Sequence, residues 1–221
     1  MKVCCISSPA EAALAVEYGA DALGLVAEMP SGPGILRDAQ VREIAATVPP
    51  GVDTFLLTSL TEAAGIVEQV RFCGTTTVQI VSHIDPKQYP AIIERLPNVR
   101  RVQVIHVQDE QALDLITRYA PFVHAFLLDS GRPDAAVAEL GGTGRTHDWR
   151  ISARFVTATD KPVFLAGGLR PDNVAAAIAQ VQPYGIDLCS GVRSDDQLDA
   201  TKLAAFVQDL GSAGVPGEDS R

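Results

Sequence analysis

The sequence predicts a single (β/α)8 barrel, in which eight parallel strands alternate with eight helices. Short apolar runs recur eight times along the 221 residues, and a segment with helical spacing follows each run. Strict alternation implies a parallel sheet covered by helices, and eight units favour closure into a barrel over an open sheet. Runs such as 22–26 and 125–128 are apolar at consecutive positions, which is typical of strands covered on both faces.

The elements follow one another in a regular order. The strand-like runs begin near Lys2, Ala22, Val52, Thr77, Arg100, Val123, Pro162 and Gly185. The segments that place apolar residues on one helical face cover 9–18, 37–48, 60–70, 86–96, 109–119, 148–156, 171–181 and 201–210. We expect residues 1–210 to form one barrel domain. Residues 211–221 are rich in glycine, serine and charge, and we expect them to form a flexible tail.

Charge and hydropathy argue against several classes of partner. The formal net charge of −9 argues against nucleic acid or an anionic membrane as a general partner. No apolar run approaches the roughly 18–20 residues that a membrane span needs. Met1-Lys2 leads directly into a strand-like run, without the organisation of a signal peptide. We therefore expect a cytoplasmic protein.

Neither the cysteine spacing nor a nucleotide-binding motif predicts a cofactor. Cys4, Cys5, Cys73 and Cys189 match no zinc-binding spacing, and a core of this size needs no disulfide, so we expect reduced thiols and no metal site. Cys4 and Cys5 are adjacent, and on a strand their side chains would point to opposite faces. The sequence has neither a Walker A motif nor a GxGxxG motif after a strand, so no nucleotide cofactor is indicated.

Three glycine-bearing segments predict a phosphate site. They are Gly141–Gly144, Gly167-Gly168 and Ser190-Gly191, and the last two each directly follow a short apolar run. A strand, a glycine turn and a helix in sequence aim backbone N–H groups at an anion. Two such units in succession suggest a phosphate clamp between the last two strands of the barrel. The alternative is that these glycines only form tight turns or helix C-caps.

Asp129 and a cysteine of the first strand are candidate reactive groups at the same face. Asp129 follows an apolar run, so its carboxylate must be exposed at the barrel mouth or paired. Strand ends of barrels are enriched in catalytic groups, although Asp129 could equally cap the following loop. Cys4 or Cys5 could be reactive, but a cysteine on a strand is more often a small buried hydrophobe. The long connections 27–36 and 130–147 would lie on this face too.

These motifs together resemble the phosphoribosylanthranilate isomerase family of tryptophan biosynthesis, from Lys2 to about Leu210. The family's N-terminal signature Lys-(Ile/Val)-Cys-Gly-Ile is present as Lys2-Val3-Cys4-Cys5-Ile6. The other matching segments are Gly19–Gly24, Val78-Gln79-Ile80, Leu128-Asp129-Ser130, Gly141–Gly144 with Asp148-Trp149, Leu165–Leu169 with Pro171–Val174, and Ser190-Gly191-Val192. Each motif alone is weak, whereas the combination is specific.

The resemblance implies an Amadori rearrangement, in which a phosphoribosyl aminoaldose opens its ring and becomes a 1-amino-1-deoxyketose phosphate. By position, Asp129 would be the general acid that protonates the ring oxygen, and Cys4 the general base that removes the C2 proton. Backbone amides would bind the substrate phosphate at Gly142, Gly144, Gly167, Gly168, Ser190 and Gly191. The implied partner is a small-molecule phosphosugar, with no metal or organic cofactor, and the protein could be a monomer or a homodimer.

The chain departs from the family pattern on the anthranilate side. The family has an arginine after the second strand that contacts the anthranilate carboxylate, and this chain has Gly34 there. Arg37 could replace that arginine if the loop is reshaped. Arg193 stands where the family has glutamate, which predicts a charge reversal at the mouth. Losing a buried charged hydrogen bond costs on the order of 2–5 kcal/mol. Two alternatives therefore stay open: a divergent paralogue acting on another aminoaldose phosphate, and a non-catalytic phosphosugar-binding protein.

Overall fold

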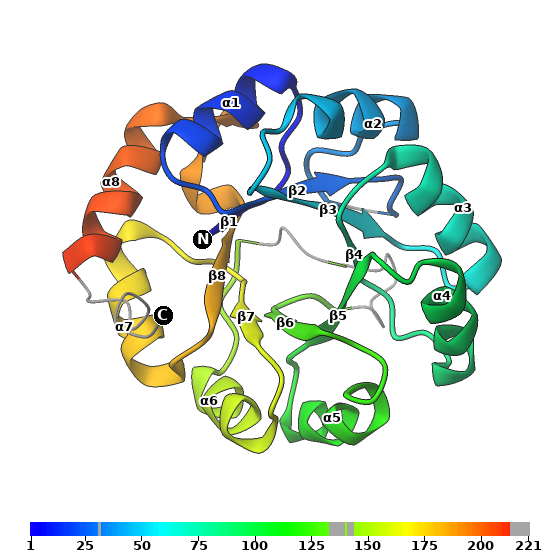
Figure 1. Ribbon diagram of the computed structural model, residues 1–221. Helices are drawn as coiled ribbons and strands as arrows, with labels where there is room; N and C mark the ends of the chain where they lie inside the picture. The colour runs from blue at the N-terminus through cyan, green and yellow to red at the C-terminus, as the bar shows by residue number, and fades with distance from the viewer. Residues whose placement is uncertain (31, 133–139, 141–143, 213–221) are drawn as a thin grey trace.

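Eight parallel strands close into a barrel, and neighbouring strands follow one another in chain order (Figure 1). This computed structural model describes residues 1–30, 32–132, 140 and 144–212. The strands are β1 Lys2–Val3, β2 Ala22–Val26, β3 Asp53–Thr58, β4 Thr77–Ile80, β5 Arg100–His106, β6 Ala125–Asp129, β7 Val163–Leu165 and β8 Gly185–Leu188. The first and last strands pair in parallel, with Lys2 opposite Asp187, and this pairing closes the barrel.

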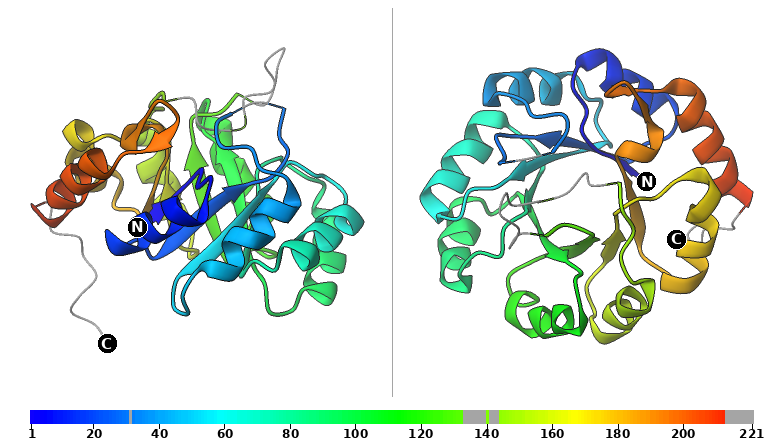
Figure 2. Two further views of the ribbon diagram at one scale, coloured as in Figure 1. Left: turned by 90° about the horizontal axis from the view of Figure 1, so that it is seen from above. Right: turned by 180° about the vertical axis from the view of Figure 1, so that it is seen from behind.

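In the described part of the chain, eight α-helices form a ring around the strands (Figures 1 and 2). They are α1 Pro9–Glu17, α2 Asp38–Thr47, α3 Ala63–Cys73, α4 Tyr89–Arg95, α5 Asp114–Tyr119, α6 Trp149–Ala158, α7 Pro171–Val181 and α8 Ala200–Ser212. Short 3-10 helices lie at η1 Pro86–Gln88, η2 Glu110–Leu113 and η3 Ser190–Val192. A small antiparallel pair consists of β9 Arg193–Ser194 and β10 Gln197–Leu198.

The predicted barrel is confirmed, and its strands and helices differ from the prediction only at their ends. The predicted helices at 86–96 and 109–119 each begin as a 3-10 turn. The last helix continues to Ser212, so the first two residues of the predicted tail are helical, and residues 213–221 lie outside the described residues. The β9–β10 pair was not predicted, because strands of two residues leave no periodic pattern. Among the described residues, no helix is both long enough and apolar enough to cross a membrane.

Two apolar clusters lie on opposite faces of the sheet. In β6, Phe126 and Leu128 belong to the cluster that packs against the helices, whereas Leu127 belongs to a second cluster with Phe55 and Val104. Successive side chains of a strand point to opposite faces, so the second cluster fills the barrel interior. Each such buried side chain contributes about 1.5–3 kcal/mol relative to an exposed one. These clusters give the barrel mouth a rigid support.

Local signals set the helix ends that border the mouth. The Ser8 hydroxyl accepts a hydrogen bond from the Glu11 N–H at 3.2 Å, which caps α1 directly after the first strand. The Asp148 carboxylate accepts one from the Arg150 N–H at 2.9 Å and caps α6. Capping at these positions fixes where the preceding loops turn back toward the barrel axis.

Candidate active site

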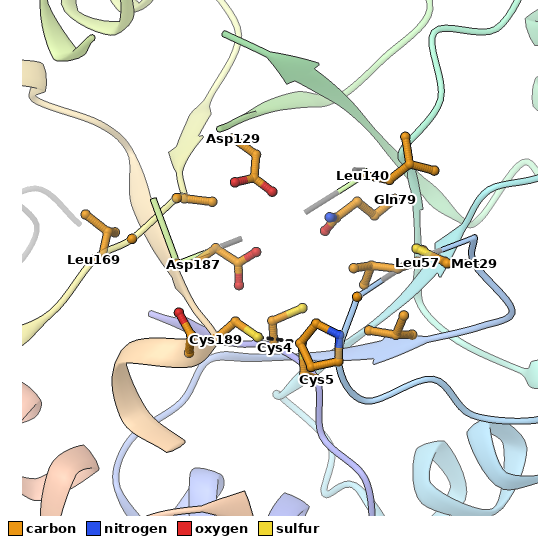
Figure 3. A pocket seen from close by; sticks show the side chains of 18 residues that line it. Cys4, Cys5, Met29, Leu57, Gln79, Asp129, Leu140, Leu169, Asp187 and Cys189 are labelled. Carbon is orange, nitrogen blue, oxygen red and sulfur yellow. Dashed lines mark hydrogen bonds between the residues drawn. The ribbon is translucent and has the colours of Figure 1, made fainter. Parts of the chain in front are cut away.

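A pocket opens at the carboxyl ends of the strands, and both ends of the chain contribute to it (Figure 3). Its described lining residues are Cys4, Cys5, Val26, Met29, Gly32, Pro33, Leu57, Gln79, Asp129, Leu140, Gly144, Ala166, Gly167, Gly168, Leu169, Asp187, Cys189 and Ser190. Residues of both long connections, 27–36 and 130–147, are among them. The pocket therefore lies on the face where the sequence predicted the site.

Asp129 ends β6 and is buried at the pocket wall. Its Oδ1 accepts a hydrogen bond from the Ser130 N–H at 2.7 Å. Burial raises the pKa of the Asp129 carboxyl, although the Ser130 hydrogen bond and the charge of Lys2 oppose this. Gly167 leaves room beside it, because a Cβ at that position would lie 3.2 Å from both Asp129 Oδ1 and His147 Nδ1. The carboxyl is therefore biased toward its protonated form in a space that only a glycine leaves open.

Cys4 continues the line of β1 and points into the same pocket from another side (Figure 3). Its N–H donates to the Leu188 carbonyl at 2.7 Å. A hydrogen bond with the Cys5 thiol lowers the pKa of the Cys4 thiol, and the positive charge of Lys2 lowers it further, against the effect of burial. Gly24 of β2 makes room for the sulfur, since a Cβ there would lie 2.6 Å from Cys4 Sγ. Cys4 is biased toward the thiolate.

A buried ion pair lies beneath these two groups. Lys2 Nζ is 2.7 Å from Asp187 Oδ2, and both side chains are almost fully removed from solvent. Burial alone would lower the pKa of Lys2, but the charge and hydrogen bond of Asp187 together with the charges of Cys4 and Cys5 outweigh it, so the net shift is upward and Lys2 stays protonated. No role for Lys2, Asp187 or Gln79 was predicted from the sequence. Each of them is a polar residue next to apolar residues on a buried strand, and this is the signal that could have marked them.

Cys5 does not face away from Cys4, and the expectation of opposite faces is wrong. The strand ends at Val3, and Cys5 has a left-handed backbone with φ of 62°. Both thiols therefore line the pocket. The family has glycine at this position, which is the residue that adopts such a φ without strain. Cys5 Sγ lies 2.6 Å from Cys189 Sγ, and contact with that sulfur, together with Cys4 and burial, raises the pKa of Cys5 well above its ordinary value.

The glycine segments converge at the far end of the pocket. A Cβ on Gly191 would lie 2.1 Å from the Leu169 carbonyl oxygen, and one on Gly168, which has φ of 61°, would lie 2.6 Å from the Arg145 carbonyl carbon. A Cβ on Gly144 would lie 3.5 Å from Ser190 Oγ. These segments therefore touch one another through glycines. Gly142, the remaining predicted phosphate ligand, lies outside the described residues.

Neither predicted anthranilate-side arginine lines the pocket. Arg37 precedes α2, and its Nε donates to Gln40 Oε1 at 3.1 Å on the exposed surface. Arg193 is buried, so the predicted charge reversal at the mouth is wrong. Its guanidinium donates to both Glu11 carboxylate oxygens at 3.1 Å and to the carbonyls of Cys4 and Cys5. The sequence could not show this, because Glu11 and Arg193 are 182 residues apart.

Apolar side chains line the part of the pocket formed by β2, β3 and the connection after β2. Val26, Met29 and Leu57 line it, and Gly32 and Pro33 complete it. Among the lining residues of the described chain there is no lysine or arginine. The described residues also contain no group of three or more histidine, cysteine, aspartate or glutamate side chains that could hold a metal ion. The pocket thus combines two carboxyls, Asp129 and Asp187, with a set of thiols and glycine turns.

Comparison with known proteins gives one consistent result. Residues 1–209 match the family model described as N-(5'-phosphoribosyl)anthranilate isomerase. The chain is 33% identical over 211 residues to the N-(5'-phosphoribosyl)anthranilate isomerase of Methanocella arvoryzae, covering 95% of this chain and 97% of that one. It is 38% identical over 209 residues to the enzyme of Pelobacter propionicus, covering 94% and 93%. The crystal structure of phosphoribosyl anthranilate isomerase from Thermotoga maritima superposes with a TM-score of 0.81 at 26% identity, covering 96% and 98%.

Proposed function

The chain belongs to the N-(5'-phosphoribosyl)anthranilate isomerase family, and from that premise we propose how its pocket performs the reaction. The substrate is phosphoribosylanthranilate, and the product is the corresponding 1-amino-1-deoxyribulose 5-phosphate. The observation that carries the assignment of residues is the pair Cys4 and Asp129. They line one pocket, and their surroundings shift their pKa values in opposite directions. The shift of the thiol favours its deprotonated form and the shift of the carboxyl favours its protonated form, which are the forms that a general base and a general acid need.

Asp129 acts first, as the general acid. Burial raises the pKa of its carboxyl, which keeps a proton available on the side of the pocket where β6 ends. Transfer of that proton to the ring oxygen of the ribose opens the ring. The bond between C1 and that oxygen breaks, and the nitrogen lone pair forms a Schiff base with C1.

Cys4 acts second, as the general base. Its thiol is held toward the thiolate by Cys5 and by Lys2, whose own charge is kept by Asp187. The thiolate removes the proton from C2, and the electron pair of that C–H bond neutralises the Schiff base and gives an enolamine. Tautomerisation of the enolamine, with proton return to C1, gives the ketone.

The glycine-bearing end of the pocket binds the phosphate. The loop containing Gly144, the turn at Gly167-Gly168 and the start of η3 at Ser190-Gly191 meet there. The first N–H groups of a helix have no intrahelical acceptor and are free to bind an anion. Backbone binding fits a chain with a net charge of −9, because it needs no cationic side chain.

The test replaces each reactive group in turn. Cys4→Ala and Asp129→Asn should each lower kcat by roughly 10²–10⁴-fold with freshly made phosphoribosylanthranilate, the usual contribution of a general base or acid. Matched controls are Cys73→Ala, a buried thiol on α3, and Asp160→Asn on the surface; both should keep wild-type kcat. Full activity of Cys4→Ala or of Asp129→Asn would contradict the role proposed for the residue that was replaced. No turnover by the wild-type chain would remove the proposed reaction itself.

A further inference from the structure

The free cysteines of the described chain are unevenly distributed. Cys4, Cys5 and Cys189 line the pocket, whereas Cys73 lies on α3, with its Sγ 3.8 Å from the Asp38 carbonyl oxygen. Cys5 Sγ and Cys189 Sγ are 2.6 Å apart, although the two residues are 184 positions apart in sequence. The proposed reaction needs one thiolate, at Cys4. The contact between the other two thiols has no role in it.

Two sets of contacts hold the backbone around this thiol pair. Arg193, four residues after Cys189, donates to the carbonyls of Cys4 and Cys5 and is paired with Glu11 of α1. The same side chain thus ties the segment after β8 to the segment after β1. On the other side, Gly34 lies so close that a Cβ on it would be 2.8 Å from Cys5 Cβ. The backbone of Cys5 is therefore held next to the segment that carries Cys189 by the Glu11–Arg193 pair (the clamp) and by the loop after β2.

We propose that Cys5 and Cys189 form a reversible disulfide by exchange with a small disulfide such as oxidised glutathione, and that this bond inactivates the enzyme. Cys189 is the half-buried member of the pair and meets the reagent first, while Cys5 is 4% exposed. The Cys189 thiolate attacks one sulfur of the small disulfide, forms a mixed disulfide and releases one thiolate. Cys5 then attacks the Cys189 sulfur and displaces the second. The two protein thiols are oxidised to the disulfide. Their two protons pass to the two released thiolates, so the reagent is reduced to two thiols.

The bond would act on the pocket in two ways. It removes the S–H proton of Cys5, which supports the thiolate of Cys4, the adjacent residue. It also joins the segments after β1 and β8 covalently at the pocket wall, where substrate must enter. The loss of activity rests on the proposed role of Cys4, whereas formation of the disulfide does not.

The test is an oxidised-glutathione titration of the full chain, followed by peptide mapping without reduction and by activity measurement. We expect one new bridged peptide pair, Cys5 with Cys189, and a fall in kcat/KM of at least about tenfold that dithiothreitol restores. Cys189→Ser and Cys5→Gly, each scored against its own reduced form, should change less than about twofold on oxidation. Cys73→Ala should remain as sensitive as the wild type.

Two results would overturn the proposal. One is a map without the Cys5–Cys189 bridge when oxidised glutathione is in large excess. The other is a bridged protein that keeps its full reduced activity. If the reduced chain does not convert phosphoribosylanthranilate, the proposed reaction fails instead, and the peptide map still decides whether the thiol pair forms the bond.

Discussion

At the phosphate end of the pocket, Gly168 and Gly191 face backbone atoms of neighbouring loops, whereas at the opposite end Gly34 has a side-chain atom, Cys5 Cβ, as its nearest neighbour. Backbone atoms can move only with the whole loop, so the phosphate end tolerates no added Cβ. At Gly34 the nearest atom, Cys5 Cβ, is removed if Cys5 is exchanged for glycine, although the Cys5 carbonyl oxygen and Cα would still lie 3.0 and 3.1 Å from the added Cβ. The Gly34 end can therefore change if two positions change together. The two ends of the pocket thus differ in how readily they accept amino-acid substitutions. This matches the sequence, which keeps the family motifs at the first end and departs from them at the second.

The largest expected effect concerns the clamp beneath the Cys5 end. Glu11→Gln leaves the Arg193 guanidinium buried without its charge partner and should lower the free energy of unfolding by about 3–5 kcal/mol. The exposed Glu17→Gln on the same helix should change it by less than about 0.5 kcal/mol. Denaturant unfolding measures both. Equal stability of the two variants would mean that side-chain pairing does not hold this end.

Glu11→Gln should also change how the stability of the protein depends on pH. Burial alone would raise the pKa of Glu11, but hydrogen bonds from Arg193, Leu198 N–H and Ser7 N–H lower it overall. A lowered folded-state pKa contributes stability above the unfolded value of 4.5, and that contribution is lost as the pH falls through the folded value. The wild type should lose this stability in acid, and Glu11→Gln should lack that part of the pH dependence.

The next largest effect tests the backbone-built end. Gly191→Ala places a Cβ 2.1 Å from the Leu169 carbonyl oxygen, so the turn must shift, and kcat/KM should fall about 100-fold. The control is Gly74→Ala at the end of α3, where φ is 71° but no atom lies within 4 Å. It should cost about 1 kcal/mol of stability and leave KM unchanged. Wild-type kcat/KM in Gly191→Ala would contradict a phosphate end built from close backbone contacts.

A smaller effect is expected at Gly34. Gly34→Arg must accommodate a φ of 73° and the contact with Cys5, and kcat/KM should fall about tenfold. Adding Cys5→Gly removes the nearest contact, so the double variant should recover part of this loss and show a non-additive cycle. Purely additive effects would mean that the two positions are not coupled, and the contrast between the two ends would lose its basis.

The smallest effect is a shift of the pH–rate profile. Cys5→Gly suits the left-handed backbone but removes the thiol whose hydrogen bond lowers the pKa of Cys4. The Cys4 pKa should rise, so the acidic limb of kcat/KM should move to higher pH, with a severalfold loss on that limb and little change at the plateau. An unmoved acidic limb would show that Cys5 does not support the base.

The sequence located Asp129 and Cys4, the proposed acid and base, better than it located their surroundings. Asp129 was found because it ends an apolar strand, and the end of a barrel strand is a place for chemistry. Cys4 was found as one of two adjacent thiols. The alternation of side chains along a strand then predicted the wrong direction for Cys5, because the strand ends at Val3. Arg193 was placed at the mouth because its partner, Glu11, lies at the other end of the chain.

By itself the sequence determined the eight-unit barrel, the face on which the pocket lies and the glycine turns at one end of it. These follow from local periodicity and from turns that require glycine, and both signals come from residues that are close together in the sequence. The tertiary structure alone decided that Cys5 meets Cys189, that Gly34 meets Cys5 and that Arg193 is paired away from the pocket. Closure of the barrel brings the first and last strands together, and contacts between such distant segments leave no pattern in the sequence of either one.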